Sequence, residues 1–288
     1  MTTSKKTVIV TGCSKDSLGE ALAKEFHRRN YHVIATARSL SRLESLASMG
    51  IDTRELDLLS SSSIKSFCAG ITSLDILFNN AGGNLVMPFA DTSPQEFRHM
   101  FDLNFFPVIE LTQFLLPHII RSKGIIVNHT SQSAYGLKVP ATAYACAKAA
   151  LACLTDCMRI ELAPFDVRVV EVVTGMASSN ITKFEATPRL PQGSIYSPVR
   201  ERFEKSMKGA DADGYQMSAE KWAKRVVSDL LDRWFGTPKW IWRGAFATTM
   251  YVIYWADILW KGCMDGPFRA AIGIGGLKKL LAEEKKTA

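Results

Sequence analysis

A tyrosine and a lysine four positions apart are the residues in this chain best placed to transfer a proton. Tyr144 and Lys148 lie in the alanine-rich stretch 143–152, whose composition favours a helix. In a helix this spacing puts both side chains on one face. An ammonium group beside a phenol stabilises its phenolate form, which makes the phenol a better acid. The pair therefore predicts general acid–base chemistry, with Tyr144 exchanging the proton.

A serine thirteen residues before Tyr144 supplies a second polar group. Ser131 follows the apolar segment 124–128, which predicts a strand. A hydroxyl group at the end of that strand can hydrogen-bond a substrate oxygen as negative charge develops on it. Pairs with the spacing of Tyr144 and Lys148 are common by chance, so Ser131 makes the pattern more specific.

A turn with two glycines joins the first predicted strand, Thr7–Val10, to the first predicted helix, Leu18–Arg29. Such a turn directs backbone N–H groups and the positive end of the helix towards a phosphate group. A purely structural turn is the alternative. In the favoured interpretation the loop binds the pyrophosphate of a dinucleotide, and the residues expected to do so are Gly12, Ser14, Lys15, Ser17, Leu18 and Gly19.

The second predicted strand, His32–Ala37, is followed by Arg38 and not by a carboxylate. An acidic residue at this point would bond the ribose 2′-hydroxyl of NAD. The paired donors of a guanidinium group suit a 2′-phosphate instead. Arg38 therefore favours NADP(H) as the cofactor, the alternative being a solvated surface arginine.

Short apolar segments alternate with longer amphipathic ones along the 288 residues. Further strands are expected at 74–79, 124–128 and 167–173, and helices at 40–48 and 218–231, the last with Ser218 as its N-cap. This alternation predicts an α/β fold with a Rossmann-like, doubly wound parallel sheet. We expect a single domain over 1–244, with a substrate lid at the irregular stretch 176–217 and an apolar C-terminal extension over 245–288.

In their order along the chain, these residues resemble the short-chain dehydrogenase/reductase family over the first two-thirds of the sequence. The motifs that carry the resemblance are the loop 11–19, Asp57, the run 79–82, Asn104, Ser131, and the pair Tyr144 and Lys148. The resemblance implies that Asn104 helps to hold a water linking the lysine to solvent. It also implies that Ser131 positions the substrate, that Tyr144 is the acid or base, and that Lys148 bonds the nicotinamide ribose as well.

The same resemblance assigns further residues to the cofactor. It implies that Asp57 lies near the adenine, that Asn80 supports the cofactor, and that Ala177 and Ser179 contact it on the nicotinamide side. Asp16 and Ser17 depart from the family pattern, since relatives tend to have glycines there, and we expect cofactor affinity to be the property affected. Pro107 replaces a small residue and Thr174 replaces a common proline.

A narrower similarity lies in the segment 190–196 and the following Arg200. It is similar to fungal 1-acyldihydroxyacetone phosphate reductases and to reductases of secondary metabolism. The implied function is an NADPH-dependent oxidoreductase that reduces a lipid-like or bulky ketone or oxidises the matching secondary alcohol. The alternative is a non-redox cyclase or isomerase, or a cofactor-binding scaffold, on the same fold. Relatives are commonly dimers or tetramers, so a homo-oligomer is also implied.

Composition limits the other partners. The net charge of +7 comes from scattered basic residues, which gives no nucleic-acid stripe. The histidines lack metal-ligand spacing, so no metal site is expected. Six cysteines without a C-x-x-C motif, after an N-terminus with no apolar signal, indicate a reducing, cytoplasmic location. Cys153 and Cys157, one helical turn apart, are expected to be buried as small hydrophobic residues.

The stretch 245–256 is uncharged and rich in aromatic residues. It is too short to span a bilayer. Two interpretations remain open. The segment packs on the domain or on a partner subunit, or residues 245–262 lie against an internal membrane, where tryptophan, tyrosine and flanking lysines are favourable.

Overall fold

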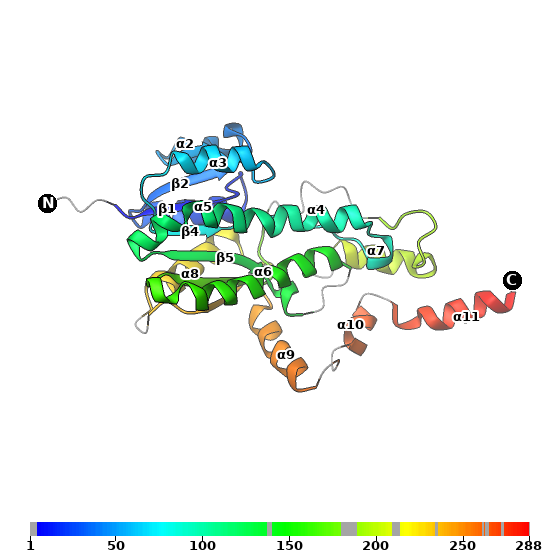
Figure 1. Cartoon of the computed structure of the whole chain (residues 1–288). Helices are drawn as coiled ribbons and strands as arrows, with labels where there is room; N and C mark the ends of the chain where they lie inside the picture. The colour runs from blue at the N-terminus through cyan, green and yellow to red at the C-terminus, as the bar shows by residue number, and fades with distance from the viewer. Residues whose placement is uncertain are drawn as a thin grey trace.

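One parallel sheet forms the centre of the part of the chain that the structure describes, residues 5–136, 140–179, 189–208, 214–233, 236–260, 262, 265–271 and 274–287. In this computed structural model the sheet has seven strands in the order β3-β2-β1-β4-β5-β6-β7 (Figure 1). The strands are β1 (Thr7–Val10), β2 (His32–Ala37), β3 (Asp52–Glu55), β4 (Ile76–Asn79), β5 (Ile125–Ser131), β6 (Arg168–Thr174) and β7 (Trp240–Arg243).

The central strands are buried along almost their whole length because both faces of the sheet are covered. Successive side chains of a strand point to opposite faces. Val8 and Val10 accordingly belong to one buried cluster, while Ile9 between them belongs to another. The central strands therefore contribute to two cores, as expected for a doubly wound sheet.

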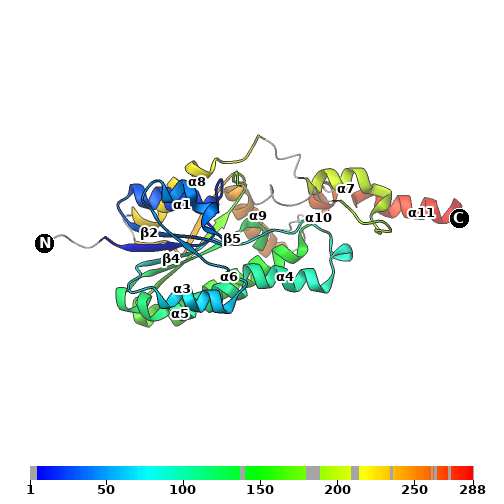
Figure 2. The same ribbon diagram turned by 90° about the horizontal axis from the view of Figure 1, so that it is seen from above.

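Helices cover the two faces of the sheet in separate layers (Figure 2). One layer contains α1 (Leu18–Arg28), the short α2 (Glu44–Ala47) and α8 (Ala219–Leu231). The other contains α3 (Ser61–Ala69), α5 (Phe106–Ser122) and α6 (Thr142–Glu161), with α4 (Pro94–Asn104) extending beyond the sheet. The predicted Rossmann-like fold is confirmed.

The run Pro94–Ser122 is long and apolar enough to cross a membrane by length and composition. In the fold, its second half is a core helix. Leu111, Leu115 and Ile119 of α5 are buried against the sheet in the second cluster. The backbone also leaves helical geometry at Phe105, between α4 and α5, where φ is −125° and ψ is −62°. Pro107 lies in the first turn of α5, where its missing N–H is tolerated.

Two strands were not predicted. β3 is a polar edge strand and lacks the apolar pattern of a buried one. β7 is short, and its pairing with β6 is a long-range contact that a local pattern does not report. The stretch expected to be irregular, 176–217, also contains a helix, α7 (Arg200–Met207), preceded by the 3-10 turn η6 (Ser197–Val199). Ser218 caps α8 as predicted, because its side chain accepts a hydrogen bond from the backbone of Lys221.

The predicted burial of two cysteines is wrong. Cys153 and Cys157 are exposed on α6, because the buried face of that helix runs through Tyr144, Lys148 and Thr155. Cys263 lies outside the described residues.

After β7 the chain forms three further helices, α9 (Ala247–Leu259), α10 (Asp265–Ala271) and α11 (Leu277–Thr287). Figure 1 shows them leading away from the edge of the sheet. Helix α9 packs one side against the domain, beside β7, and exposes the other. The packing interpretation of this segment therefore accounts for one of its faces.

Candidate active site

The loop between β1 and α1 has the geometry of a phosphate-binding turn. Gly12 has φ +72°, and a Cβ added to it would lie 2.8 Å from the Cα of Ala81. A Cβ on Gly19 would collide with the carbonyl oxygen of Gly12 and lie 2.6 Å from Nδ2 of Asn80. Both positions need glycine because the loop passes so close to the segment after β4. The tight turn leaves the start of α1 facing the cavity described below.

The two departures from a glycine-rich loop are accommodated locally. Asp16 takes the left-handed conformation, with φ 61°, which aspartate tolerates better than most residues. Its backbone N–H donates to the Glu20 side chain at 2.6 Å. Ser17 has extended backbone and caps α1, accepting a hydrogen bond from the Glu20 N–H at 3.0 Å. The loop therefore keeps its turn without glycine at these two positions.

A cavity of about 560 Å³ opens at the carboxyl ends of the central strands, where the chain order of the sheet reverses between β1 and β4. This is where doubly wound sheets bind their ligands. Of the residues predicted to bind cofactor, those that line the cavity are Gly12, Ser14, Ser17, Leu18, Arg38, Asp57, Asn80 and Ser179. Those predicted but outside the lining are Lys15, Gly19, Ala177, Tyr144 and Lys148.

The end of the cavity beside β2 is positively charged. Arg38 directly follows β2, and Arg42, which the sequence analysis did not single out, also lines the cavity. The carbonyl oxygen of Arg42 accepts a hydrogen bond from the backbone of Lys15 at 3.2 Å, which ties the glycine loop to this segment. In the sequence, the position of Arg42 four residues after Arg38 was the feature that could have indicated its role. Two guanidinium groups at this end suit a phosphate beyond the adenosine ribose.

Asn80 is held by a buried network that the sequence did not predict. Its Nδ2 donates to the carbonyl oxygen of Thr11 at 2.7 Å, and its Oδ1 lies 2.9 Å from Nδ1 of His129. Nε2 of His129 lies 2.6 Å from the Thr174 hydroxyl. Because Oδ1 can only accept, Nδ1 carries the imidazole proton and Nε2 accepts from Thr174.

His129 is neutral in this network. Burial, followed by the charge of Lys148, lowers its pKa to about 3. Its ring also lies against Trp222, with centroids 5.2 Å apart. His129 and Thr174 together connect the ends of β5 and β6 to Asn80, so the threonine that replaces the family's common proline has a hydrogen-bonding role here.

Asn104 and Lys148 meet beneath Gly82. Asn104 is fully buried at the end of α4, where its Nδ2 donates to the Met100 carbonyl oxygen at 2.9 Å and its Oδ1 accepts from the Gly83 N–H at 3.2 Å. A Cβ on Gly82 would lie 2.6 Å from Oδ1 of Asn104 and 3.4 Å from Nζ of Lys148. Gly82 thus lets both side chains approach the cavity floor.

Lys148 is buried and lies beside Tyr144. Its Nζ donates to the carbonyl oxygen of His129 at 2.8 Å and is 5.9 Å from the centroid of the Tyr144 ring. Burial lowers the pKa of Lys148 to about 8. The tyrosine is also buried, on the same face of α6. A lysine that titrates near neutral pH next to a phenol can assist proton transfer.

Ser131 ends β5, and its hydroxyl is oriented by the short turn that follows. The Ser131 Oγ accepts a hydrogen bond from the Ser133 N–H at 3.1 Å and donates to the Ser133 hydroxyl at 3.0 Å.

The loop after the neighbouring strand β6 is held by two β-bridges, from Met176 to Ala245 and from Ala177 to Met217. Ala177 therefore lies where the first and last residues of the expected lid meet, with Ser179 two residues further on.

The cavity suits a dinucleotide on two further observations. Asn84 lines it, and its Oδ1 is buried with no hydrogen-bond partner among the described residues, so a polar ligand group would satisfy it. The glycines at 12 and 82 also line it, so at these points the backbone borders the cavity without a side chain. Among the described residues, no group of three or more metal-ligating side chains occurs.

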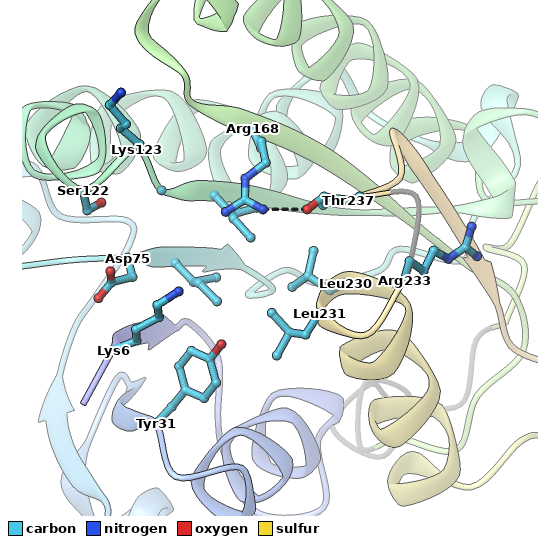
Figure 3. A pocket seen from close by; sticks show the side chains of 14 residues that line it. Lys6, Tyr31, Asp75, Ser122, Lys123, Arg168, Leu230, Leu231, Arg233 and Thr237 are labelled. Atoms are coloured by element: carbon cyan, nitrogen blue, oxygen red, sulfur yellow. Dashed lines mark hydrogen bonds between the residues drawn. The ribbon is translucent and has the colours of Figure 1, made fainter. Parts of the chain in front are cut away.

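A second cavity, of about 250 Å³, lies at the opposite end of the central strands, where they begin (Figure 3). Lys6, Lys123, Arg168 and Arg233 line it, with Tyr31 and Asp75. None of the predicted site residues lies there. The helices α5 and α8 end there, and basic side chains near helix C-termini complement the helix dipole. This second cavity is therefore explained by the fold.

Comparisons with known proteins agree with this geometry. The family described as short chain dehydrogenase matches residues 6–189. A short-chain dehydrogenase/reductase of Pestalotiopsis microspora is 38% identical over 277 residues, covering 95% of this chain and 96% of the relative. The NADPH-dependent 1-acyldihydroxyacetone phosphate reductase of Schizosaccharomyces pombe is 36% identical over 209 residues, covering 68% of this chain and 69% of the relative.

Among solved structures, a short-chain dehydrogenase from Streptomyces avermitilis superposes with a TM-score of 0.79 at 26% identity. The match covers 94% of this chain and 99% of that structure. The similarity therefore includes the region of the expected lid as well as the sheet.

Proposed function

Because the chain belongs to the short-chain dehydrogenase family, we propose that it is an NADPH-dependent reductase that converts a lipid-like or bulky ketone into a secondary alcohol. The observation that carries the proposal is the buried Lys148 beside the Tyr144 ring, next to Gly82, which lines the cavity that begins at the glycine loop. The same groups would catalyse the reverse oxidation.

In this reaction NADPH supplies the hydride that reduces the carbonyl carbon. The chain's own groups act on the carbonyl oxygen. Ser131 hydrogen-bonds this oxygen, and Tyr144 donates the proton to it as negative charge develops. Lys148 stabilises the phenolate that Tyr144 leaves behind. Asn104, buried next to Lys148, would hold a water that returns a proton to the pair.

Arg38 and Arg42 support the choice of NADPH over NADH, since both line the cavity near the end of β2. Asn80, Ser14 and Ser17 would contact the phosphates, Asp57 the adenosine, and Ala177 and Ser179 the nicotinamide end. The Schizosaccharomyces pombe relative is named as an NADPH-dependent reductase, which agrees with this assignment.

The substrate class is inferred from the expected lid and from the relatives. Leu190, Phe203 and Met207 form a buried apolar cluster that packs against Val86 and Met87, just after the cofactor-lining segment. An apolar lid suits a bulky or lipid-like ketone, which includes both acyl ketones and secondary metabolites. We place the reaction in the cytoplasm, in keeping with the free cysteines of the described residues.

The proposal is tested by following NADPH absorbance with a panel of bulky ketones. Tyr144→Phe removes the proton donor and should lower turnover by about two powers of ten or more. Tyr31→Phe, which removes a phenol in the cavity where the central strands begin, is the matched control and should leave turnover unchanged. Equal turnover in the Tyr144→Phe variant would remove Tyr144 from the mechanism. NADPH binding without oxidation by any ketone of the panel would favour the non-redox alternative.

A further inference from the structure

Helix α9 has a packed side and an exposed side of different character. Ala247 is buried, and Tyr254 contacts the Tyr135 ring, with centroids 4.9 Å apart. On the other side Val252, Trp255, Ile258 and Leu259 are 61%, 47%, 52% and 70% exposed. The helix contains one charged residue, Asp257, whose carboxylate accepts a hydrogen bond from the Gly262 backbone. The exposed side is therefore a continuous apolar surface, which marks a contact with another phase or molecule.

The composition and length of α9 fit a lipid surface. Trp255 and the exposed Trp260 that follows the helix are residues favoured where a membrane meets water, because an indole has an apolar body and one polar group. Thirteen residues of helix reach about 20 Å, against a hydrocarbon core of about 30 Å. The helix is therefore suited to lie along the surface and not to cross it.

The charge of the neighbouring segments complements anionic headgroups. The residues after Trp260 include six lysines and arginines against three acidic residues. A groove of about 610 Å³ between α7 and α11 is lined by Arg200, Arg202 and Lys205, with Glu201 as its one acidic residue. Arg202 also donates to the Ala270 carbonyl oxygen at 2.8 Å, which fastens α7 to α10. Basic segments in the same protein as an exposed apolar helix face are the combination that binds anionic membranes.

We propose that α9 docks this protein on a membrane that carries anionic lipids, with its apolar face among the acyl chains and the basic groove between α7 and α11 at the headgroups. A second copy of the chain would also cover apolar side chains. The excess of lysines and arginines in the segments that follow α9 favours the lipid, because two copies would bring these like charges together.

The same helix is in contact with the segment that follows Ser131. A Cβ on Gly136 would collide with Cε of Met250 in α9. Tyr135 packs against Trp242 and Tyr254, and its hydroxyl donates to the buried carboxylate of Glu171 at 2.6 Å. A lipid-like ketone leaving the membrane would therefore meet the substrate side of the site along α9. This entry route rests on the proposed function, whereas the docking does not.

The docking is tested by sedimenting the full-length protein with vesicles of phosphatidylcholine alone and of phosphatidylcholine mixed with phosphatidylserine. We expect binding to the mixed vesicles, weakened by added salt. The variant Val252→Asp/Ile258→Asp should bind these vesicles at least about tenfold less, because it places two charges in the apolar face. The matched control, Ile160→Asp/Phe165→Asp, changes side chains that are 67% and 50% exposed elsewhere on the surface, and should bind like the wild type.

NADPH titration and thermal unfolding show whether each variant is folded. Wild-type protein that stays in the supernatant with both kinds of vesicle would overturn the proposal. So would an α9 variant that binds as the wild type does. Analytical ultracentrifugation adds a further outcome: an oligomer that the α9 variant dissociates, without vesicle binding by the wild type, would assign the face to a second copy. Because vesicle binding is read without turnover, a failure of ketone reduction leaves this test unaffected.

Discussion

At the carboxyl ends of the central strands, polar side chains are held by hydrogen bonds to one another. On α9, beyond β7, apolar side chains are exposed. Asn80 and His129 connect the ends of three strands by hydrogen bonds between buried atoms. On α9, Val252 and Trp255 are exposed and contact little of their own domain. The polar groups of Asn80 and His129 find hydrogen-bond partners within the domain, whereas the apolar side chains on this side of α9 are not covered by it.

The difference matches the two tasks that the proposed function gives the protein. A dinucleotide has a constant shape, so its site would benefit from groups that are fixed in advance. The proposed ketone would need an entrance, and α9 leaves apolar surface exposed beside the segment that follows Ser131. The following changes test this division, from the largest expected effect to the smallest.

Two tryptophans, one in the core and one on α9, allow the contribution of each region to the free energy of unfolding to be compared. Trp222 is fully buried in the core between α8 and the sheet, and Trp222→Ala should lower the free energy of unfolding by about 3–5 kcal/mol. Trp255→Ala, on the exposed side of α9, should change it by about 0.5 kcal/mol or less. Urea unfolding followed by circular dichroism measures both. Similar losses for the two variants would mean that α9 is as integral to the fold as α8.

Arg38 tests how the proposed cofactor site distinguishes NADPH from NADH. Arg38→Ala should weaken NADPH binding roughly ten- to hundredfold, the range expected for hydrogen bonds to a charged group, and change NADH binding much less. Arg54→Ala on β3, where the arginine pairs with Asp52 at 2.8 Å, is the control for a lost surface charge. Fluorescence titration with both nucleotides measures the effect. Equal losses for NADPH and NADH would show that Arg38 does not recognise the 2′-phosphate.

The pH dependence of ketone reduction reports on Lys148. Burial lowers the pKa of this lysine to about 8, so its positive charge is lost as the pH rises through that value. We expect kcat/KM to fall by roughly tenfold per pH unit above about 8. His129 should add no break near its ordinary pKa of 6.5, because burial lowers its pKa to about 3. A profile that stays level through pH 9 would contradict the role of Lys148.

The same shift has a consequence for stability. Between about pH 8 and 10.5 the unfolded lysine keeps a proton that the folded one has lost, so the free energy of unfolding contributed by Lys148 rises with pH across this window. The sign is opposite to that of activity. Comparing the wild type with Lys148→Met by urea unfolding at several pH values separates this contribution from the other titrating groups.

The smallest expected effect is on NADPH affinity, at Asp16, one of the two departures from the glycine pattern of the loop. Asp16→Asn keeps a residue that tolerates the left-handed conformation but removes a negative charge from the phosphate-binding turn. NADPH affinity should rise about two- to fivefold, corresponding to less than about 1 kcal/mol. Asp166→Asn, at φ 57° in an exposed turn far from the cavity, is the control and should leave affinity unchanged. A weaker affinity after Asp16→Asn would mean that the carboxylate helps to hold the loop.

Much of the fold could be predicted because it is encoded in local patterns. The strands at β1 and β2 were predicted with the observed bounds, since a buried parallel strand is a short apolar run. The helix at α8 was predicted from its period and from Ser218, whose capping bond is local. The spacing of Ser131, Tyr144 and Lys148 was likewise readable, because residue types and spacings do not depend on contacts, whereas Asn104 was assigned only through the family resemblance.

What could not be predicted depends on which distant segments meet. His129 is one histidine among five in the sequence, and only the approach of Asn80 and Thr174 makes it a connecting group. Cys153 and Cys157 were expected inside because their residue type is usually buried, but the rotation of α6 on the sheet exposes them.

The sequence by itself determined the alternation of strands and helices and the set of groups available for chemistry, because periodicity and residue type are local properties. Only the tertiary structure decided that β7 closes the sheet beside β6, and that Lys148 is buried between Gly82 and His129. It also decided which side of α9 is exposed. These outcomes depend on packing between residues far apart in the chain, and the burial that shifts a pKa or leaves an apolar face uncovered arises only from that packing.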